Sequence, residues 1–352
     1  MSLYQRLIDQ GVIDYGGSIF GRFETIDLHT AGEPLRVILK GYPEIQGHDV
    51  LSRRRYCQDE LDHLRTALML EPRGHSDMYG CLLVPPDNPD SDFGVLFLHN
   101  AGYSTMCGHA IIALTYLMHA RGWKDASGDK MELRIDAPCG TIHSWIERDH
   151  LDHPTVSFRG VPSFVVGTRA EVAVPPWGRV QYVLAYGGAF YAYVDADELG
   201  LDISLENSIE IKETGMLIKQ AVMAKDDRIS HPFESDLSFL YGTIFTSKRS
   251  PAGCDSYNVC IFADGELDRC PTGSGLSGRM AIEHLVHGLP LQKSFSVESI
   301  TGGKYVGFAE SELNFGSHAA VVPQISGQAF ITGEHTFILE ENDVLGRGFR
   351  IR

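Results

Sequence analysis

Two distant segments of the chain follow the same pattern, and this repetition constrains the fold more than any other feature. Cys107-Gly108-His109-Ala110 and Thr272-Gly273-Ser274-Gly275 each place glycine before a run of apolar residues with helical spacing. His119 and His284 lie at the same offset in the two runs. Each segment is typical of a glycine-rich turn that opens a helix. The chain is therefore predicted to contain two similar halves.

The match extends to the segments around the two helices. Strand-like stretches separated by glycine-bearing turns occur in the same order in each half: Leu35–Lys40, Leu133–Asp136 and Thr141–Glu147, then Ala189–Asp195, Phe295–Glu298 and Lys304–Ala309. We expect an α+β fold of two pseudo-symmetric halves, each a mostly antiparallel β structure around one principal helix. The active site is expected in the cleft between the halves.

The length of the chain also favours two domains. At roughly 100–200 residues per domain, 352 residues allow two cores, and we place the boundary near Leu151. The expected halves are residues 1–150 together with the returning C-terminal tail, about 338–352, carrying Cys107, and residues 151–337, carrying Asp268 and Thr272.

The charge of the chain argues against nucleic acid and membrane partners. The 46 Asp and Glu residues outnumber 30 Lys and Arg residues, and the formal charge of −16 repels phosphate backbones and anionic lipid surfaces. The basic run Arg53-Arg54-Arg55 has acidic residues around it. The longest apolar stretch, Ala110–Met118, is far shorter than the roughly 20 residues of a membrane-spanning helix.

The cysteines and the N-terminal segment favour a cytoplasmic protein. The seven cysteines show no regular spacing and no C-x-x-C pair, which disfavours a disulfide framework and a zinc site. Met1–Gly17 mixes charged and apolar residues and lacks the apolar core of a signal peptide. We therefore expect no metal, and we expect any important cysteine to act as a thiol.

The two helix starts offer a site for an anion. Glycine at a helix start exposes backbone N–H groups and the positive end of the helix dipole, which together hold a carboxylate. Cys107 lies at such a start, where the pKa of a thiol is expected below its usual value of about 8.5. Cys107 is thus a candidate base, and the alternative is a cysteine buried for packing.

The second helix start carries a hydroxyl in place of the thiol. Thr272 does not ionise near neutral pH, so it can form hydrogen bonds or cap its helix but is a poor acid. Asp268, slightly upstream, is suited to bind an ammonium or secondary amine. A solvent-exposed loop aspartate is the alternative.

Four motifs together resemble those of the proline racemase family, whose fold is that of diaminopimelate epimerase. They are Met106-Cys107-Gly108-His109, Asp268–Gly275, Asp27–Pro34 and Pro72–Gly80, and they occur in the expected order over most of the chain. In that family, two cysteines flank the α-carbon of a cyclic amino acid. Cys107 matches the first, whereas Thr272 stands at the position of the second.

The resemblance implies an activity and a set of roles. Threonine at the second position is typical of the trans-3-hydroxy-L-proline dehydratase branch, which forms Δ1-pyrroline-2-carboxylate without a cofactor. Cys107 would abstract the α-proton, and Asp268 would bind the ring nitrogen. The resemblance assigns the substrate carboxylate to Gly108, His109, Gly273 and Ser274, and the aromatic walls to Tyr79 and Phe262, for which core packing is the alternative.

Other readings of the sequence remain open. A proline racemase or 4-hydroxyproline 2-epimerase would need Cys270 or water as the second acid, although Cys270 is best explained as a packing or loop cysteine. A catalytically silent amino-acid-binding protein would keep the cleft and lose turnover. In each case the partner is a small cyclic amino acid, and the sequence leaves open whether the chain forms a homodimer. His29 and His75 are expected to stabilise turns.

Overall fold

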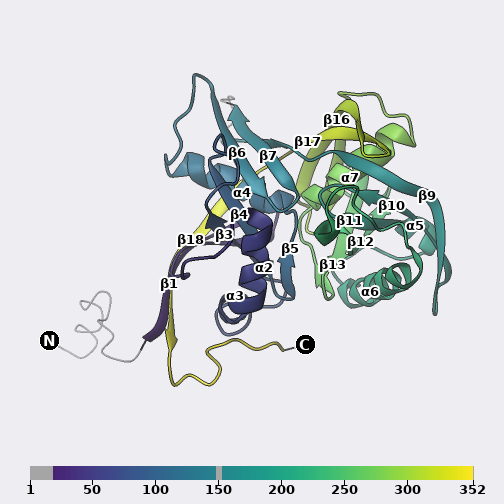
Figure 1. Cartoon of the computed structure of the whole chain (residues 1–352). Coiled ribbons are helices and arrows are strands. Elements are labelled where there is room, and N and C mark those ends of the chain that lie inside the picture. Colours follow the sequence, from purple (N-terminus) through teal and green to yellow (C-terminus); the bar gives the residue numbers. More distant parts are fainter. Residues whose placement is uncertain (1–18, 148–152, 352) are drawn as a thin grey trace.

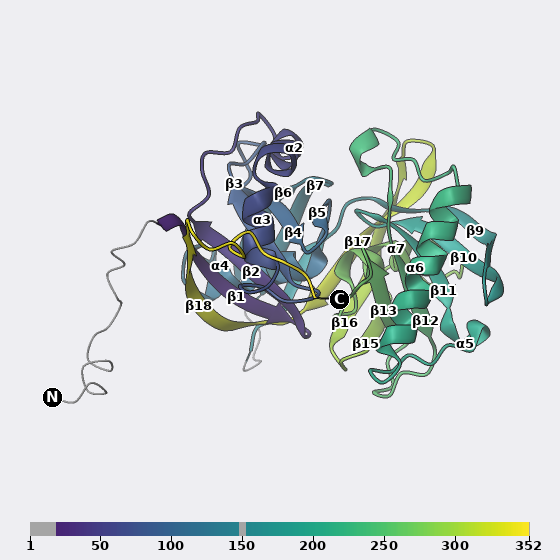
Figure 2. The same ribbon diagram turned by 90° about the horizontal axis from the view of Figure 1, so that it is seen from below.

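The computed structural model describes residues 19–147 and 153–351. Its two halves lie side by side (Figures 1 and 2). The boundary expected near Leu151 and the segment Met1–Gly17 lie outside the described residues. Within the described ranges, no helix is both long enough and apolar enough to cross a membrane.

In the first half, antiparallel and parallel strand pairs alternate. β1 is antiparallel to β2, β2 is parallel to β3, β3 is antiparallel to β4, β4 is parallel to β6, and β6 is antiparallel to β7. The short β5 forms a hairpin with β4. These strands are β1 (Ile19–Thr30), β2 (Glu33–Lys40), β3 (Tyr79–Val84), β4 (Phe93–His99), β5 (Gly102–Ser104), β6 (Lys130–Ala137) and β7 (Gly140–Glu147).

The second half repeats this order strand by strand. β10 is antiparallel to β11, β11 is parallel to β12, β12 is antiparallel to β13, β13 is parallel to β15, and β15 is antiparallel to β16. The short β14 forms the hairpin with β13. The strands are β9 (Ser163–Val174), β10 (Gly178–Tyr186), β11 (Phe190–Asp195), β12 (Leu240–Ser247), β13 (Ser256–Phe262), β14 (Glu266–Leu267), β15 (Phe295–Ser299), β16 (Lys304–Phe315) and β17 (His318–Gly327). The expected α+β fold of two similar halves is confirmed.

The helices occupy equivalent places because each parallel strand pair needs a crossover connection. α2 and α3 connect β2 to β3, and α6 lies between β11 and β12. α4 and α7 follow the two short hairpins and precede β6 and β15. The helices are α2 (Val50–Glu60), α3 (Asp62–Met69), α4 (Gly108–Ala120), α5 (Ala196–Leu199), α6 (Ser208–Lys225) and α7 (Gly273–Leu285).

The principal helices lie inside their halves. α4 contacts β1, β2, β7 and the C-terminal strand β18 (Ala329–Glu340), and α7 contacts β9, β10, β16 and β17. Apolar residues occupy nearly every side of α4, and Ile111, Ile112 and Leu114 have no exposed surface. A helix that is apolar all round must be enclosed, so the strands on several sides of α4 follow from its sequence.

The C-terminal part of the chain returns to the first half. β18 (Ala329–Glu340) pairs antiparallel with β1, and Figure 1 shows the two strands side by side. The return begins at Ala329, earlier than the expected residue 338, because β1 pairs with β2 along one edge only and its other edge needs a long partner. β8 (Val156–Arg159) pairs with both β7 and β17 and so joins the halves.

Candidate active site

The starts of α4 and α7 meet between the two halves. A Cβ atom added at Gly108 would lie 2.6 Å from the Cα of Gly273, so only glycine allows this approach. The cavity beside them has a volume of about 20 Å³, which is room for about one water molecule. The structure therefore shows the cleft closed, with no room for a molecule the size of an amino acid.

The structure brings all the predicted site residues together. The cavity is lined by Tyr79, Cys107, Gly108, His109, Phe262, Asp268, Thr272, Gly273 and Ser274, and also by Met106, Tyr191, Tyr241 and Cys260. The first half supplies the thiol and the second half supplies the carboxylate. Their roles in a reaction stay predictions.

Cys107 caps the start of α4. Its side chain is 4% exposed, and its Sγ accepts a hydrogen bond from the Ala110 N–H at 3.4 Å. Burial raises the pKa of the Cys107 thiol well above its usual range, and the negative charges of Asp268 and Glu33 add to this effect. The expected lowering of the pKa is therefore wrong for the closed site, because burial raises the pKa of the thiol more than the helix start lowers it.

His109 faces the thiol as a neutral ring. Its Nδ1 lies 3.1 Å from the Cys107 Sγ, and its ring packs edge-on against Tyr79 with centroids 4.8 Å apart. Burial lowers the pKa of His109 to about 3. A neutral imidazole can donate from one nitrogen and accept at the other, so His109 can share a hydrogen bond with the thiol without adding charge.

Thr272 and Asp268 form a hydrogen-bonded pair on the opposite side. The Thr272 Oγ1 donates to the Asp268 Oδ2 at 2.7 Å, and the Cys270 N–H donates to the Asp268 Oδ1 at 2.8 Å. Asp268 is 5% exposed, which rules out the solvent-exposed alternative, and burial raises its pKa. Thr272 does not cap its helix with its side chain.

The backbone of Thr272 is strained. Its φ of 63° lies in the left-handed region, which is rare for a β-branched residue and costs of order 1–3 kcal/mol. In this backbone conformation the Thr272 side chain donates a hydrogen bond to Asp268 and does not cap the N–H groups of α7. Those N–H groups are thereby left available for an anion.

Tyrosine hydroxyls complete the wall. The Tyr191 hydroxyl lies 2.7 Å from the Ser274 Oγ, and the Tyr79 hydroxyl lies 2.5 Å from the Ser104 Oγ and 3.4 Å from the Tyr241 hydroxyl. Sequence reasoning missed Tyr191 and Tyr241. Both lie in strands that are buried on both faces, so hydropathy does not separate side chains that face a cavity from those that face a core.

The remaining cysteines also differ in position. Cys260 lines the cavity from β13, and sequence reasoning gave no signal for it. Cys270 is absent from the described residues that line the cavity; it is fully buried, and its Sγ accepts from the Thr272 N–H at 3.3 Å. Within the described ranges, no group of three His, Cys, Asp or Glu residues is arranged to hold a metal ion.

The two motif histidines lie outside the cavity. The His29 Nδ1 accepts a hydrogen bond from the Gly32 N–H at 3.2 Å within the turn between β1 and β2. The His75 Nδ1 lies 2.8 Å from the Ser76 carbonyl oxygen. Both rings therefore hold local turns, as expected.

Solved structures share this fold. A hydroxyproline epimerase from Agrobacterium vitis with bound trans-4-OH-L-proline is 28% identical, with a TM-score of 0.86 over 94% of this chain and 96% of that chain. A phenazine biosynthesis protein of the PhzF family from Bacillus anthracis is 10% identical, with a TM-score of 0.56 over 90% of this chain and 99% of that chain. The second likeness concerns the fold alone.

Sequence relatives cover nearly the whole chain. A trans-3-hydroxy-L-proline dehydratase of Colwellia psychrerythraea is 43% identical over 93% of this chain and 92% of its own length. The human protein of that name is also 43% identical, over 93% of this chain and 94% of its own length. The family model described as proline racemase matches residues 25–350. The chain therefore belongs to the proline racemase family.

Proposed function

We propose that this chain is a hydro-lyase that dehydrates trans-3-hydroxy-L-proline to Δ1-pyrroline-2-carboxylate. The relatives named as trans-3-hydroxy-L-proline dehydratases support this activity. The observation that carries it is the asymmetry of the two helix starts. One presents the thiol of Cys107, and the other presents the hydroxyl of Thr272, which is bonded to Asp268.

The stereochemistry of the substrate explains why one thiol is enough. In trans-3-hydroxy-L-proline the hydroxyl and the carboxylate lie on opposite faces of the ring, so the α-hydrogen and the hydroxyl share a face. The Cys107 thiolate takes the α-proton, the electrons of that C–H bond expel the hydroxide, and the thiol returns the proton to form water. The enamine product tautomerises to the cyclic imine. A second thiol has no step to perform.

Cys107 must lose its proton before it can act as a base. In the closed site, burial and the negative charges of Asp268 and Glu33 oppose that loss. A bound substrate places its ammonium beside Asp268 and offsets one negative charge, while the Ala110 N–H and the start of α4 favour the thiolate. These positive groups offset part of the effect of burial, and Cys107 loses its proton to solvent while the cleft is open.

The other predicted residues bind the substrate. Gly108, His109, Gly273 and Ser274 line the cavity at two helix starts, and the N–H groups of a helix start suit a carboxylate. Asp268 accepts from the ring ammonium, and Thr272 keeps the Asp268 carboxylate oriented through its 2.7 Å hydrogen bond. Tyr79 and Phe262 exclude water from the closed cavity, which strengthens these charge interactions.

The activity is tested with purified protein and trans-3-hydroxy-L-proline, with o-aminobenzaldehyde present to trap the cyclic imine. We expect the coloured adduct to form with this substrate. A parallel incubation of L-proline in D2O, followed by mass spectrometry, measures exchange of the α-hydrogen, and chiral chromatography measures racemisation. Racemisation of proline at a rate comparable to dehydration would favour the epimerase alternative.

A further inference from the structure

The end of β1 and the turn between β1 and β2 contact the start of α4 in the first half and Thr301 in the second half. The Thr30 Oγ1 donates to the His109 carbonyl at 3.0 Å, next to Cys107 on α4. On its other side, the turn meets the second half, where the Thr301 Oγ1 lies 3.2 Å from the Ala31 carbonyl oxygen. This segment therefore contacts the helix that carries Cys107 directly, and it contacts the half that carries Asp268 through Thr301.

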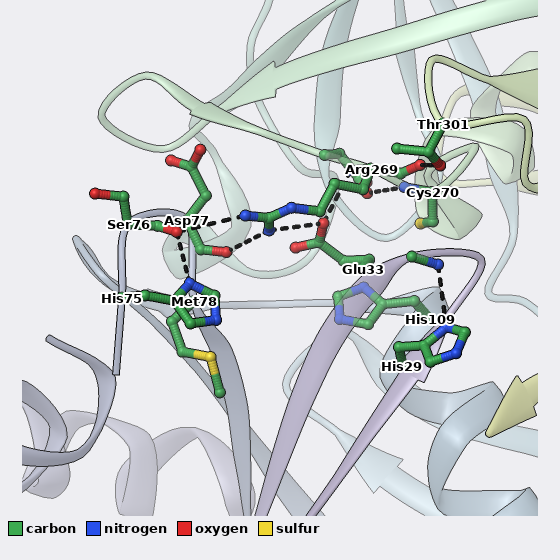
Figure 3. Close-up of polar contacts among 12 residues, drawn as sticks. His29, Glu33, His75, Ser76, Asp77, Met78, His109, Arg269, Cys270 and Thr301 are labelled. Carbon is green, nitrogen blue, oxygen red and sulfur yellow. Dashed lines mark hydrogen bonds and ion pairs between the residues drawn. The ribbon is translucent and has the colours of Figure 1, made fainter. Parts of the chain in front are cut away.

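Glu33, the first residue of β2, reaches the second half with its side chain. Its carboxylate is fully buried, and its Oε2 accepts from the Arg269 N–H at 2.9 Å and lies 3.4 Å from the Arg269 Nη1. The same Nη1 donates to the Asp77 carbonyl at 2.7 Å. Figure 3 shows the Arg269 side chain lying between Glu33 and the Ser76–Asp77 segment, both from the first half.

The hydrogen bond to the Arg269 N–H acts on Asp268. This N–H belongs to the peptide unit that joins Asp268 to Arg269, and a peptide unit is planar and includes the Cα atoms of both residues. Holding the N–H therefore fixes the plane from which the Asp268 side chain begins. Asp268 in turn holds the next N–H, that of Cys270, at 2.8 Å.

Glu33 shares its buried surroundings with the Asp268 carboxylate and the Arg269 guanidinium. Burial raises the pKa of Glu33, the negative charge of Asp268 raises it further, and Arg269 lowers it. Among the residues that the structure describes, the Glu33 Oε1 finds no hydrogen-bond partner. Two buried carboxylates thus lie close to one guanidinium, and the ring ammonium of the proposed substrate adds a second cation beside Asp268.

We propose that Glu33 is a positioning residue for the dehydration, which acts through the Asp268–Arg269 peptide and holds Asp268 in its amine-binding orientation when the halves close. The inference rests on the proposed function. A residue of the first half, Glu33, would then orient the Asp268 carboxylate of the second half. The amine-binding site would be complete only when the cleft is closed.

The experiment compares Glu33→Ala, Glu33→Gln and a matched control. Glu298 is also a buried glutamate, 4% exposed, whose Oε2 accepts a backbone N–H, that of Ala252, at 2.9 Å, but it does not line the cavity. We measure kcat and KM for trans-3-hydroxy-L-proline, the Kd for L-proline by calorimetry, and the Tm of each variant.

Glu33→Ala is expected to lower kcat/KM by about tenfold to a hundredfold, since small displacements of a catalytic group cost that much, and to raise the Kd for L-proline. Glu33→Gln keeps an acceptor oxygen for the Arg269 N–H and is expected to restore both values to within about threefold of the wild type. Glu298→Ala is expected to lower the Tm and leave kcat/KM within the same range.

Three results would overturn the proposal. The first is a Glu33→Ala variant as active as the wild type. The second is a loss of kcat/KM in Glu33→Gln equal to that in Glu33→Ala, which would show that the negative charge of Glu33 is what matters. The third is an equal loss of kcat/KM in Glu298→Ala. If Glu33→Ala does not fold, Glu33→Asp replaces it, because its shorter side chain cannot reach the Arg269 N–H. If the wild type does not dehydrate the substrate, the proposed function fails and the L-proline Kd values alone decide the role of Glu33.

Discussion

At the scale of single residues, the proposed mechanism assigns the proton transfer to the sulfur of Cys107. Cys107→Ser is expected to lower kcat by at least about a thousandfold with the fold intact, because a serine hydroxyl lacks an accessible conjugate base. The imine-trapping assay measures the activity, and circular dichroism checks the fold. Turnover within tenfold of the wild type would remove the thiolate from the mechanism.

The protonation state of His109 predicts a pH dependence of stability. Its pKa is lowered to about 3 in the folded protein, from 6.5 when unfolded, because the ring is buried. The unfolded state therefore binds a proton first as the pH falls, and stability is lost from about pH 6.5 toward pH 3, by on the order of 4 kcal/mol.

The matched measurement uses His109→Gln, which cannot be protonated in this range. Tm values of both proteins are recorded by differential scanning calorimetry between pH 7 and pH 4. The wild type is expected to lose Tm more steeply than His109→Gln as the pH falls. Parallel curves would show that His109 is not kept neutral by burial.

The sequence could predict the site residues that belong to local motifs, but not their electrostatics. Cys107 and Thr272 stand beside helix-opening glycines, so their positions follow from the local pattern. The raised pKa of Cys107 depends on residues of both halves, Asp268 and Glu33 among them. Tyr241 enters the cavity from a fully buried strand, which gives no local signal.

At the scale of elements, the contact between the starts of α4 and α7 defines the closed cleft. A Cβ at Gly273 would lie 2.7 Å from the Cα of Gly108. Gly273→Ala is therefore expected to hold the helix starts apart and to lower kcat by about a hundredfold, while each half keeps its own core. Steady-state kinetics and Tm measure the two effects, and unchanged kcat would show that closure tolerates the added atom.

The positions of helices and strands could be predicted where the hydrophobic spacing is regular. They could be predicted less well where the bounds of a strand depend on its pairing with a distant strand. The helices predicted after Cys107 and Thr272 begin at Gly108 and Gly273, as expected. Sequence analysis did not identify α6, although its buried Ile211, Ile218 and Val222 follow a helical spacing. The start of β18 depends on its pairing with β1, a contact distant in sequence.

At the scale of the whole molecule, two similar halves carry out unequal tasks. The repeated strand order places an equivalent helix start on each side of the substrate. A pair of thiols in these places could move a proton between the two faces of the α-carbon. Under the proposed function, one half supplies the base, and the other supplies an amine-binding carboxylate that is hydrogen-bonded to Thr272. The two similar halves would then act on one face of the substrate ring.

Thr272→Cys tests this difference between the halves. The variant places a second thiol opposite Cys107, where it can reprotonate the α-carbon from the other face, and we expect slow racemisation of proline or epimerisation of 4-hydroxyproline. Thr272→Ala is the control; it removes the hydrogen bond to Asp268 and is expected to weaken dehydration without any racemisation. Chiral chromatography of the products measures both. Racemisation by the wild type at a rate comparable to its dehydration would contradict the assignment of Thr272, and it would direct attention to Cys260, the other cysteine in the cavity wall, as a second acid.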